Sequence, residues 1–525
     1  MKDTYGHFAV PAVFIGAIVV GALVYGNVFR HQAPPKWDEA QHMLFAWQIW
    51  ADFTQGNIVK LLRDSHAQFY WSFLHSWWAA GFMAVFGVTD FGARISSFAA
   101  MILSVVLAFA TGKELYKERV PWAGLMAVAL LLMFRSLPGL AAQCMIELPA
   151  MMMAFLALLV YIRADQQQTA MGYTQFGCAL GATFLMKYNF GLALIGAFTV
   201  VAITEFLFNR VAFDWRSVFF VLMPLVIVVF FWLIVPEFRL NQYFETLVNR
   251  PQGPQEFGWA YVMYYPQVVY AEVGWWALLC VGALICALPH LKNRVIRLLF
   301  CVCVVYFGII FFHQTKGPRH IYPLYPALIL LTAFAVASWT NRLFKEAPRL
   351  RARMLLLAML AMFFRPVTVL GKPQIPSEEE LVPAKIAAYL GDALKDGKSV
   401  FVIGEFNAVP AHLIAWELRK RGSRIPVHQS MDYKQALEGR SAFTPGAGDS
   451  VDFSQLVELL KELSVDTVIT VGLKKTSPFY DGYYRAFNAW EQRYVDRFDS
   501  LAEYLKTASR DFTSVGLSVT IYRVH

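Results

Sequence analysis

Residues 171–208 read MGYTQFGCALGATFLMKYNFGLALIGAFTVVAITEFLF, two apolar runs that are separated by Lys187, Tyr188 and Asn189. Each run has about the length that an α-helix needs to cross the hydrocarbon core of a bilayer, roughly 20 residues. A charged side chain near hydrocarbon is costly and tends to persist for a functional reason. The stretch therefore predicts two membrane helices with polar residues at their junction.

Similar apolar runs recur along the first 370 residues. The composition is that of a chain that lives mostly in lipid, because 57% of the 525 residues are hydrophobic and only 16% are charged. We expect a polytopic α-helical membrane protein with about eleven transmembrane helices, near residues 8–29, 92–112, 120–134, 148–162, 171–187, 190–208, 217–235, 272–289, 295–312, 322–339 and 353–370.

Positive charge predicts the orientation of these helices. If the N-terminus is cytoplasmic, all the basic connections fall inside, as the positive-inside rule requires: 113–119, 161–165, 209–216, 290–297 and 341–353. These loops account for the formal net charge of +9, so we expect no nucleic acid as a partner. An odd number of crossings then places the chain after residue 370 outside the cytoplasm. The expected location is the cell inner (cytoplasmic) membrane.

One further apolar stretch complicates this topology. Residues 68–87, QFYWSFLHSWWAAGFMAVFG, are apolar enough to span, but a crossing there would put the basic segment 113–119 outside. Aromatic rings such as those of Trp and Tyr settle at the depth of the lipid headgroups, so a helix lying in the interface fits this composition better. We therefore expect one large external loop at about 30–93, with surface helices near 39–54 and 69–86.

The tail at 371–525 has mixed polarity and no run long enough to span. Strands that alternate with helices predict a small soluble α/β domain after a transmembrane domain at 1–370. The expected strands are 398–404, 424–429, 466–472 and 518–524, and the expected helices are 408–421, 453–463 and 480–505. The tail contains neither GxGxxG nor a P-loop, so no nucleotide site is expected, and a structural or acceptor-orienting role is favoured.

Ionisable and polar residues gather at the outer ends of the predicted helices. Such residues also anchor helices at an interface by snorkelling, but their shared side favours a functional site. Carboxylates beside Lys and Arg suit group transfer from a phosphate-activated lipid, because a carboxylate accepts the acceptor's proton while cations stabilise the leaving phosphate. The residues are Asp38 and Glu39; Arg94; Gln143 and Glu147; Lys187, Tyr188 and Asn189; and His313, Lys316, Arg319 and His320.

Several of these segments, in this order, resemble a known family. They are WDEAQH (37–42), HAQFYWSFLHSWWAAGFMAVFGVTDFGARISS (66–97), MIELPAMMMAFLALLVY (145–161), GATFLMKYNFGLAL (181–194) and PRHIYPLYPALILL (318–331). The series resembles the polyprenyl-phosphate-sugar glycosyltransferases of the GT-C fold, most of all bacterial aminoarabinose transferases that act on lipid A and protein O-mannosyltransferases. It covers most of residues 8–340 and excludes the tail.

The resemblance implies an inverting transfer of a sugar from a polyprenyl-phosphate donor to an extracytoplasmic acceptor, which is a lipid, a glycan or a protein. It places the acid–base residue at Asp38 and basic residues at Arg94 and Arg319. Together with the chemistry of the side chains, it gives three sets of candidates. The catalytic set is Asp38, Glu39 and Glu147; the donor phosphate-binding set is Arg94, Lys187, Lys316 and Arg319; and the further candidates are His66, Tyr188, His313 and His320.

The chain departs from the family pattern at two places. Many relatives have Asp where this chain has Glu147, and a KPPL-like stretch where it has HAQF (66–69). The glutamate is longer by one methylene, and the second change removes a lysine that His66 would have to replace. The donor headgroup or the acceptor could therefore differ from those of the better-known branches. Two carboxylates could hold a divalent metal ion or work without one, and no other cofactor is expected.

Three alternatives stay open on the sequence. Asp38 could merely cap a surface helix that starts near Ala40, as in a noncatalytic envelope assembly subunit whose tail recruits a partner. A lipid or solute transporter would also have many spans, but it commonly has duplicated halves and ionisable groups near the midplane, whereas here no repeat is found. Phosphoethanolamine transfer would need a metal cluster in the tail, whose interior histidines are only His412 and His428.

Overall fold

The computed structural model describes residues 4–30, 34–35, 37–68, 72–116, 122–208, 214–233, 257–313, 316–369, 381–394, 399–403, 411–429, 459–473, 495, 509–513 and 517–523. The chain forms two compact units. The first comprises Met1–Arg30, Gln48–Phe86 and Phe91–Lys372. The second comprises His31–Trp47, Gly87–Asp90 and Pro373–His525. Part of the predicted external loop thus belongs to the same unit as the tail.

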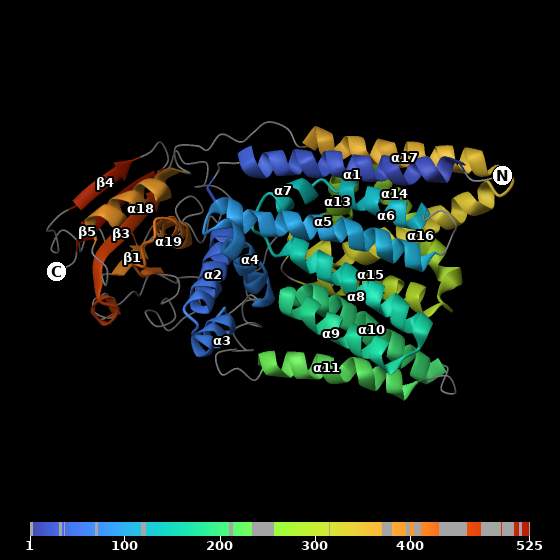
Figure 1. The fold of residues 1–525 in the computed structure, drawn as a ribbon, viewed down its shortest axis with the longest axis horizontal. Coiled ribbons are helices and arrows are strands. Elements are labelled where there is room, and N and C mark those ends of the chain that lie inside the picture. Colours follow the sequence, from blue (N-terminus) through green and yellow to red (C-terminus); the bar gives the residue numbers. More distant parts are fainter. Residues whose placement is uncertain are drawn as a thin grey trace. The chain divides into compact units, whose positions relative to one another are not determined.

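The first unit is a bundle of helices (Figure 1). The helical elements up to residue 369 are α1 (Thr4–Arg30), α2 (Trp37–Thr54), α3 (Ile58–His66), α4 (Leu74–Phe86), α5 (Asp90–Leu115), α6 (Trp122–Met133), α7 (Leu137–Ala141), α8 (Glu147–Gln167), α9 (Ala170–Met186), α10 (Tyr188–Phe208), α11 (Trp215–Leu233), α13 (Trp259–Val273), η2 (Gly274–Trp276), α14 (Ala277–Ala287), η3 (Leu288–His290), α15 (Arg294–Phe312), η4 (Pro318–Leu324), α16 (Tyr325–Leu343) and α17 (Pro348–Val369).

Within the described part of the chain, six helical stretches are long and apolar enough to cross a membrane. They are Asp90–Leu115, Glu147–Gln167, Tyr188–Phe208, Trp259–His290, Arg294–Phe312 and Pro318–Leu343, and three shorter apolar helices occur at Val13–Gly26, Trp122–Met133 and Trp215–Val228. A helical membrane protein is therefore confirmed. Each of the eleven predicted stretches contains a helix, whereas the number of crossings stays a prediction.

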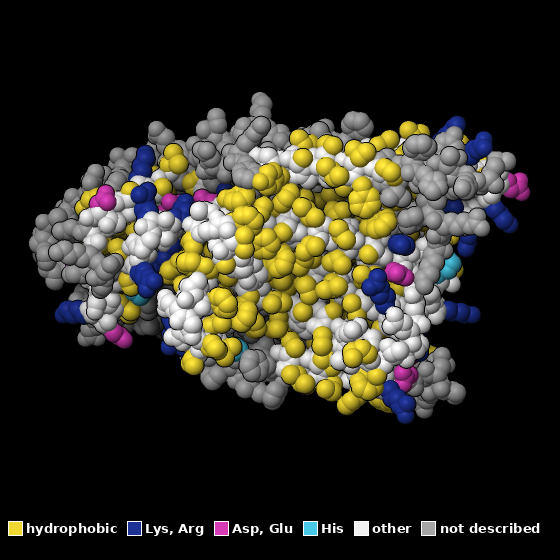
Figure 2. All heavy atoms as spheres, viewed as in Figure 1, with side chains coloured by type: hydrophobic (Ala, Val, Ile, Leu, Met, Phe, Trp, Pro, Cys, Tyr) yellow, Lys and Arg dark blue, Asp and Glu magenta, His cyan; other side chains and the backbone are white. Residues whose placement is uncertain are grey.

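Burial divides these helices into central and peripheral ones. Every residue of α6 is buried, and so are 83% of the residues in the apolar window of Pro318–Leu343. A helix that is hydrophobic on all sides packs in the interior, which explains the central position of α6. In α10 only 39% of the residues in the most apolar 18-residue stretch are buried. Figure 2 shows hydrophobic side chains covering one face of the helical unit. This apolar surface fits contact with lipid.

Three helices occupy the predicted external loop where two were expected. α2 and α4 match the expected surface helices, and α3 lies between them. The sequence analysis missed α3 because its nine residues, IVKLLRDSH, are short and mostly polar on one side. Asn57 caps its start by accepting a hydrogen bond from the backbone N–H of Lys60. α4 has 13 residues, fewer than a crossing needs.

The second unit contains a five-stranded sheet with the order β2-β1-β3-β5-β4. β1 pairs in parallel with β2 and β3, and β5 is antiparallel to β3 and β4. β1 is an interior strand and is buried along its whole length, as a strand with both faces covered should be. The elements are α18 (Val382–Ala393), β1 (Ser399–Ile403), α19 (Ala411–Lys420), β2 (Val427–Gln429), β3 (Val465–Leu473), β4 (Ser509–Thr513) and β5 (Leu517–Arg523).

β1 and β2 lie within segments that the sequence predicted as strands, and β3 and β5 overlap the predicted strands 466–472 and 518–524 but begin one residue earlier. β4 and α18 were not expected, and α19 lies inside the predicted helix 408–421. The predicted helix 480–505 lies outside the described residues, except for residue 495, and only the end of the helix predicted at 453–463 is described.

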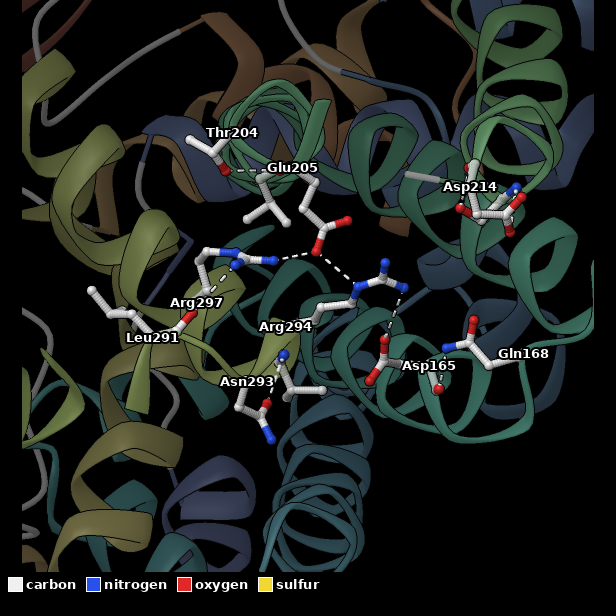
Figure 3. A network of polar contacts seen from close by, with 12 residues as sticks. Asp165, Gln168, Thr204, Glu205, Asp214, Leu291, Asn293, Arg294 and Arg297 are labelled. Atoms are coloured by element: carbon white, nitrogen blue, oxygen red, sulfur yellow. Dashed lines mark hydrogen bonds and ion pairs between the residues drawn. The ribbon is translucent and has the colours of Figure 1, made fainter. Parts of the chain in front are cut away.

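A network of ion pairs joins three helices of the bundle (Figure 3). Arg294 Nε of α15 lies 2.7 Å from Glu205 Oε1 of α10, and Arg297 contacts the same oxygen. Arg294 Nη1 also lies 4.0 Å from Asp165 Oδ1 of α8. The side chains of the two arginines and Glu205 are only 14–27% exposed. Loss of one partner would therefore cost more stability here than in an ion pair on the surface.

We expect Glu205→Gln to destabilise the bundle, because two partly buried guanidinium groups would then lose their shared anion. The loss should be about 2 kcal/mol in the free energy of unfolding, below the cost of breaking a fully buried pair. Thermal unfolding of the purified protein in detergent measures this. The control is Glu346→Gln, which removes an exposed glutamate in the turn after α16 and should change the midpoint little. Equal midpoints for both variants would contradict the role of the network.

Candidate functional site

A cluster of charged side chains lies in the helical unit where α8 begins, α9 passes into α10, and η4 precedes α16. Lys187 Nζ donates a hydrogen bond of 2.8 Å to Glu147 Oε1. Arg319 Nη1 lies 3.9 Å from the same oxygen. The side chains of Glu147 and Lys187 are 1% and 8% exposed, but that of Arg319 is 49% exposed. One buried carboxylate therefore holds one buried cation and one accessible cation.

The backbone between α9 and α10 places Lys187. Its φ of −157° and ψ of 115° are extended, so the helical path is interrupted at this residue. Its N–H still donates to the Thr183 carbonyl at 3.0 Å, and its carbonyl accepts from Phe190 N–H at 3.0 Å. Gly191 permits the close return, because a Cβ there would lie 2.4 Å from Phe184 Cα. The stretch that predicted a break between two helices thus presents the lysine.

Glu147 is the first residue of α8, where the helix dipole favours a negative charge. The turn before it is fixed to α5 by Ser97, whose hydroxyl donates to the Met145 carbonyl at 3.1 Å and accepts from Met145 N–H at 3.2 Å. Arg94 lies one helical turn before Ser97 on α5 and is buried, with 2% exposure. α5 therefore brings Arg94 to the same end of the bundle as Glu147.

Two histidines join the cluster. His313 follows α15 and His320 lies in η4, and their rings are stacked at a centroid distance of 6.3 Å and an angle of 23°. His320 also interacts electrostatically with Lys187, Arg319 and Glu147. Tyr188 begins α10 directly after Lys187. The structure thus brings these candidates together, although they come from four separate stretches of sequence.

Lys316 makes contacts that the sequence did not predict. Its Nζ lies 3.9 Å from the centroid of the Tyr261 ring, donates to the Ile310 carbonyl at 3.3 Å and also contacts the Phe311 carbonyl. The residue is 2% exposed. Cation–π contacts and backbone carbonyls therefore satisfy this ammonium group between α13 and α15. These contacts favour a structural role for Lys316 over the predicted binding of phosphate.

Asp38 and Glu39 lie in the first turn of α2, within the second unit. Because the helix begins at Trp37, Asp38 lies inside this turn instead of capping a helix that starts near Ala40. Glu39 is buried at 2% exposure, and Asp38 is partly exposed. The charge of Asp38 acts on the imidazole of His412 in α19. The candidate base therefore neighbours a residue of the tail.

Further contacts hold α19 against the loop segments of the same unit. Trp416 Nε1 donates to Asp90 Oδ1 at 2.6 Å, and Lys420 Nζ lies 3.1 Å from Asp90 Oδ2. The Arg419 guanidinium lies 4.6 Å from the centroid of the Trp47 ring. Sequence reasoning missed these pairs because their members lie more than 300 residues apart.

The remaining candidate, His66, ends α3, and its ring meets that of Phe73 edge-on at 6.2 Å. Near it lies a charged group that the sequence analysis did not select. Lys60 Nζ lies 2.6 Å from Asp52 Oδ1 and 3.7 Å from Asp64 Oδ2. Burial raises the pKa of Asp64, and a hydrogen bond and the charge of Asp52 raise it further. The i,i+4 spacing of Lys60 and Asp64 in the sequence could have predicted this ion pair.

A second unselected residue is Glu272, near the end of α13. Its carboxylate accepts from Ser136 N–H at 2.9 Å, and its backbone carbonyl accepts from Arg135 N–H at 3.2 Å. This buried glutamate fixes the loop between α6 and α7. Among the described residues, no group of three His, Cys, Asp or Glu side chains is arranged to hold a metal ion.

Residues 71–235 match the family described as dolichyl-phosphate-mannose-protein mannosyltransferase. This segment includes α4 to α11 and carries Arg94, Glu147 and Lys187. Among curated protein sequences, none is significantly similar to the chain.

Solved structures resemble nearly the whole chain. ArnT from Cupriavidus metallidurans in the apo state has a TM-score of 0.64 and 14% identity, with 98% of each chain covered. The same protein bound to undecaprenyl phosphate has a TM-score of 0.63 and 13% identity, with 97% of each chain covered. The archaeal oligosaccharyltransferase AglB from Archaeoglobus fulgidus, in complex with an inhibitory peptide and a dolichol-phosphate, gives 0.56 and 12%, with coverage of 98% of this chain and 74% of AglB. The GT-C resemblance seen in the sequence is thus confirmed at the level of the fold.

The pairing of Lys187 with Glu147 predicts a non-additive mutant cycle. Lys187→Met or Glu147→Leu alone leaves a buried charge without its main partner, which should cost about 3 to 5 kcal/mol. The double variant removes both charges and should lose less stability than either single variant. Thermal unfolding in detergent compares the three proteins with the wild type. Additive losses would show that the two side chains do not depend on each other.

The second unit should lose stability in mild acid. Burial lowers the pKa of His412 to about 4, while the Asp38 charge opposes this. Between pH 6.5 and pH 4, His412 therefore binds a proton in the unfolded chain but not in the folded unit. The free energy of unfolding should fall by about 1 to 3 kcal/mol as the pH is lowered through this range. Hydrogen exchange of peptides from 399–429, corrected for the intrinsic rate, measures this. His412→Gln should flatten the dependence, apart from a part that His428 contributes in the same direction.

Proposed function

We propose that this chain is an integral-membrane inverting glycosyltransferase that moves a sugar from a polyprenyl phosphate to an extracytoplasmic acceptor. The observation that carries the proposal is the cluster of Glu147, Lys187 and Arg319 at one end of a bundle with the fold of ArnT. One ArnT structure contains undecaprenyl phosphate, the kind of lipid that the reaction would release. The apolar flank of the bundle suits a polyprenyl chain (Figure 2).

The cluster would bind the donor phosphate through its cations. Arg319 is accessible and can bind a phosphate with two parallel hydrogen bonds, while Lys187 contributes a fixed charge behind it. Arg94 is assigned to the same task because α5 carries it to this end of the bundle. As the bond to the sugar breaks, negative charge grows on the phosphate, and cations already in place stabilise it without reorganisation.

Glu147 is assigned a positioning role rather than proton transfer. Its carboxylate is already hydrogen-bonded to Lys187 Nζ at 2.8 Å and is almost fully buried. It orients the lysine and offsets one of the positive charges when no phosphate is bound. His313, His320 and Tyr188 would supply further hydrogen bonds to the donor headgroup.

Asp38 is assigned as the general base, with Glu39 as its neighbour in the first turn of α2. The carboxylate would take the proton of an acceptor hydroxyl or amine while the acceptor atom attacks the anomeric carbon of the sugar. The bond between that carbon and the phosphate oxygen breaks, and the polyprenyl phosphate leaves with the electron pair. A single displacement of this kind inverts the anomeric configuration. A divalent ion is not required by these steps.

The proposed topology has about eleven crossings, a cytoplasmic N-terminus and an extracytoplasmic α/β domain at 371–525, in the inner (cytoplasmic) membrane. The predicted basic connections support this orientation. A transporter fits the observations less well, because the charges of the cluster lie where helices begin or end, whereas transported ligands bind near the midplane. An assembly subunit would not require Asp38 at all.

Sugar transfer by the purified protein in lipid tests the proposal, with a panel of radiolabelled polyprenyl-phosphate sugars as donors and crude envelope as the source of acceptors. Asp38→Asn should lower transfer by at least a hundredfold because the base is lost, while donor binding persists. Arg319→Gln should instead weaken donor binding about tenfold or more. Asp392→Asn, an exposed aspartate of α18, is the matched control and should retain transfer.

The results for these variants distinguish the glycosyltransferase hypothesis from the transporter and assembly-subunit hypotheses. Transfer that survives Asp38→Asn would remove this residue from the mechanism. Absence of transfer from every donor would favour the transporter or assembly reading. Donor binding that is equal in Arg319→Gln and the wild type would remove the cluster from the donor site.

A further inference from the structure

A cavity of about 380 Å³ lies in the helical unit between the end of α5, the start of α15 and the end of α16. α15 places it relative to the Glu147 cluster: His313 follows the last residue of this helix, whereas Asn293 of the cavity caps its first turn. The 19 residues of α15 span about 28 Å at 1.5 Å each. The cavity is therefore remote from the proposed donor site, and its role does not rest on the proposed function.

Phe334 of α16 forms an apolar part of the cavity wall and supports two polar neighbours. Its ring meets that of His290 edge-on, at 5.4 Å and 86°, and that of Tyr116 at 5.6 Å and 81°. Such edge-to-face contacts fix the orientation of both rings. The imidazole and the phenol are thus held in place at the cavity before any ligand arrives.

A chain of hydrogen bonds orients the Tyr116 hydroxyl. Arg351 Nη1 of α17 donates to Asn341 Oδ1 at 3.1 Å, and Asn341 Nδ2 donates to the Tyr116 oxygen at 3.3 Å. Because that oxygen accepts, its own hydrogen is left to be donated. Ser338 adds a second hydroxyl and Arg342 a guanidinium group to the lining. The described residues that line the cavity include no Asp or Glu. The lining thus offers donors and positive charge, which suits an anion.

Arg342 differs from the nearby arginines of α15. Arg294 and Arg297 are both paired with Glu205 (Figure 3), whereas Arg342 has no ion pair among the described residues. Two exposed leucines are close in sequence to residues of the cavity: Leu343 follows Arg342 and is 77% exposed, and Leu288 precedes His290 by two residues and is 51% exposed. An anion that binds here would therefore be placed beside surfaces that favour acyl chains.

We propose that this cavity binds the phosphate group of an anionic phospholipid. Arg342 pairs with the phosphate, Tyr116, Ser338 and His290 donate hydrogen bonds to it, and the acyl chains lie along Leu288 and Leu343. Basic pockets between membrane helices recognise lipid headgroups in this way. Inorganic phosphate shares the headgroup chemistry but lacks the acyl chains, so the two sources are separable by experiment.

Native mass spectrometry of the full-length protein in detergent tests the proposal by titration with phosphatidylglycerol, with phosphatidylcholine and with inorganic phosphate. The wild type should retain one phosphatidylglycerol in preference to phosphatidylcholine. Arg342→Gln should weaken this binding about tenfold through loss of the charge-assisted bonds. Ser338→Leu, which fills part of the cavity, should weaken it as well. Lys345→Gln removes an exposed charge three residues after Arg342, from a residue that does not line the cavity, and should bind like the wild type.

Equal retention of phosphatidylglycerol by the wild type, Arg342→Gln and Ser338→Leu would overturn the site. Equal loss in Lys345→Gln and Arg342→Gln would overturn it too, because general surface charge would then explain the binding. Binding of inorganic phosphate without phosphatidylglycerol would overturn the assignment to a lipid. The unfolding midpoint of each variant without added lipid shows that the protein is folded, so that lost binding reports on the cavity.

Discussion

The ion pair between Lys187 and Glu147 constrains the helical unit more than any other contact of the cluster. Neither charge tolerates burial alone, so the start of α8 and the junction of α9 with α10 must meet at hydrogen-bond distance. Local features support that meeting: the extended backbone at Lys187, the close approach at Gly191, and the bonds from Ser97 to the turn before Glu147. A helix register that separated the two side chains would leave a buried charge uncompensated, which is costly.

This ion pair gives the two cations beside Glu147 different environments. Lys187 is neutralised and hidden, whereas Arg319 shares the carboxylate at a longer distance and keeps about half of its side chain exposed. A ligand phosphate can therefore replace water at Arg319 without first breaking the buried pair. Two cations and one carboxylate leave a net positive charge, which suits the proposed binding of an anion.

The sequence predicted what depends on local composition. Apolar runs gave the positions of the helices, and charges at their ends identified Glu147, Lys187 and Arg319 as candidates. It could not show that Glu147 and Lys187 pair, because 40 residues separate them, nor that Tyr261 and Phe311 enclose Lys316. α3 and β4 were missed because short elements give weak periodic signals. The grouping of Asp38 with α19 depends on contacts across most of the chain.

Ion pairs balance the charged side chains to different degrees at the two ends of the helical unit. At one end, Arg294 and Arg297 are neutralised by acids of neighbouring helices, so those helices are fastened to one another. At the other end, Lys187 and Arg319 share the single carboxylate of Glu147, so one positive charge of these three groups is not balanced. α16 passes between both ends with 83% of its apolar window buried, from η4 and Arg319 to Arg342. One buried stretch therefore carries Arg319 near its first residue and Arg342 near its last, so the packing of this stretch positions both cations.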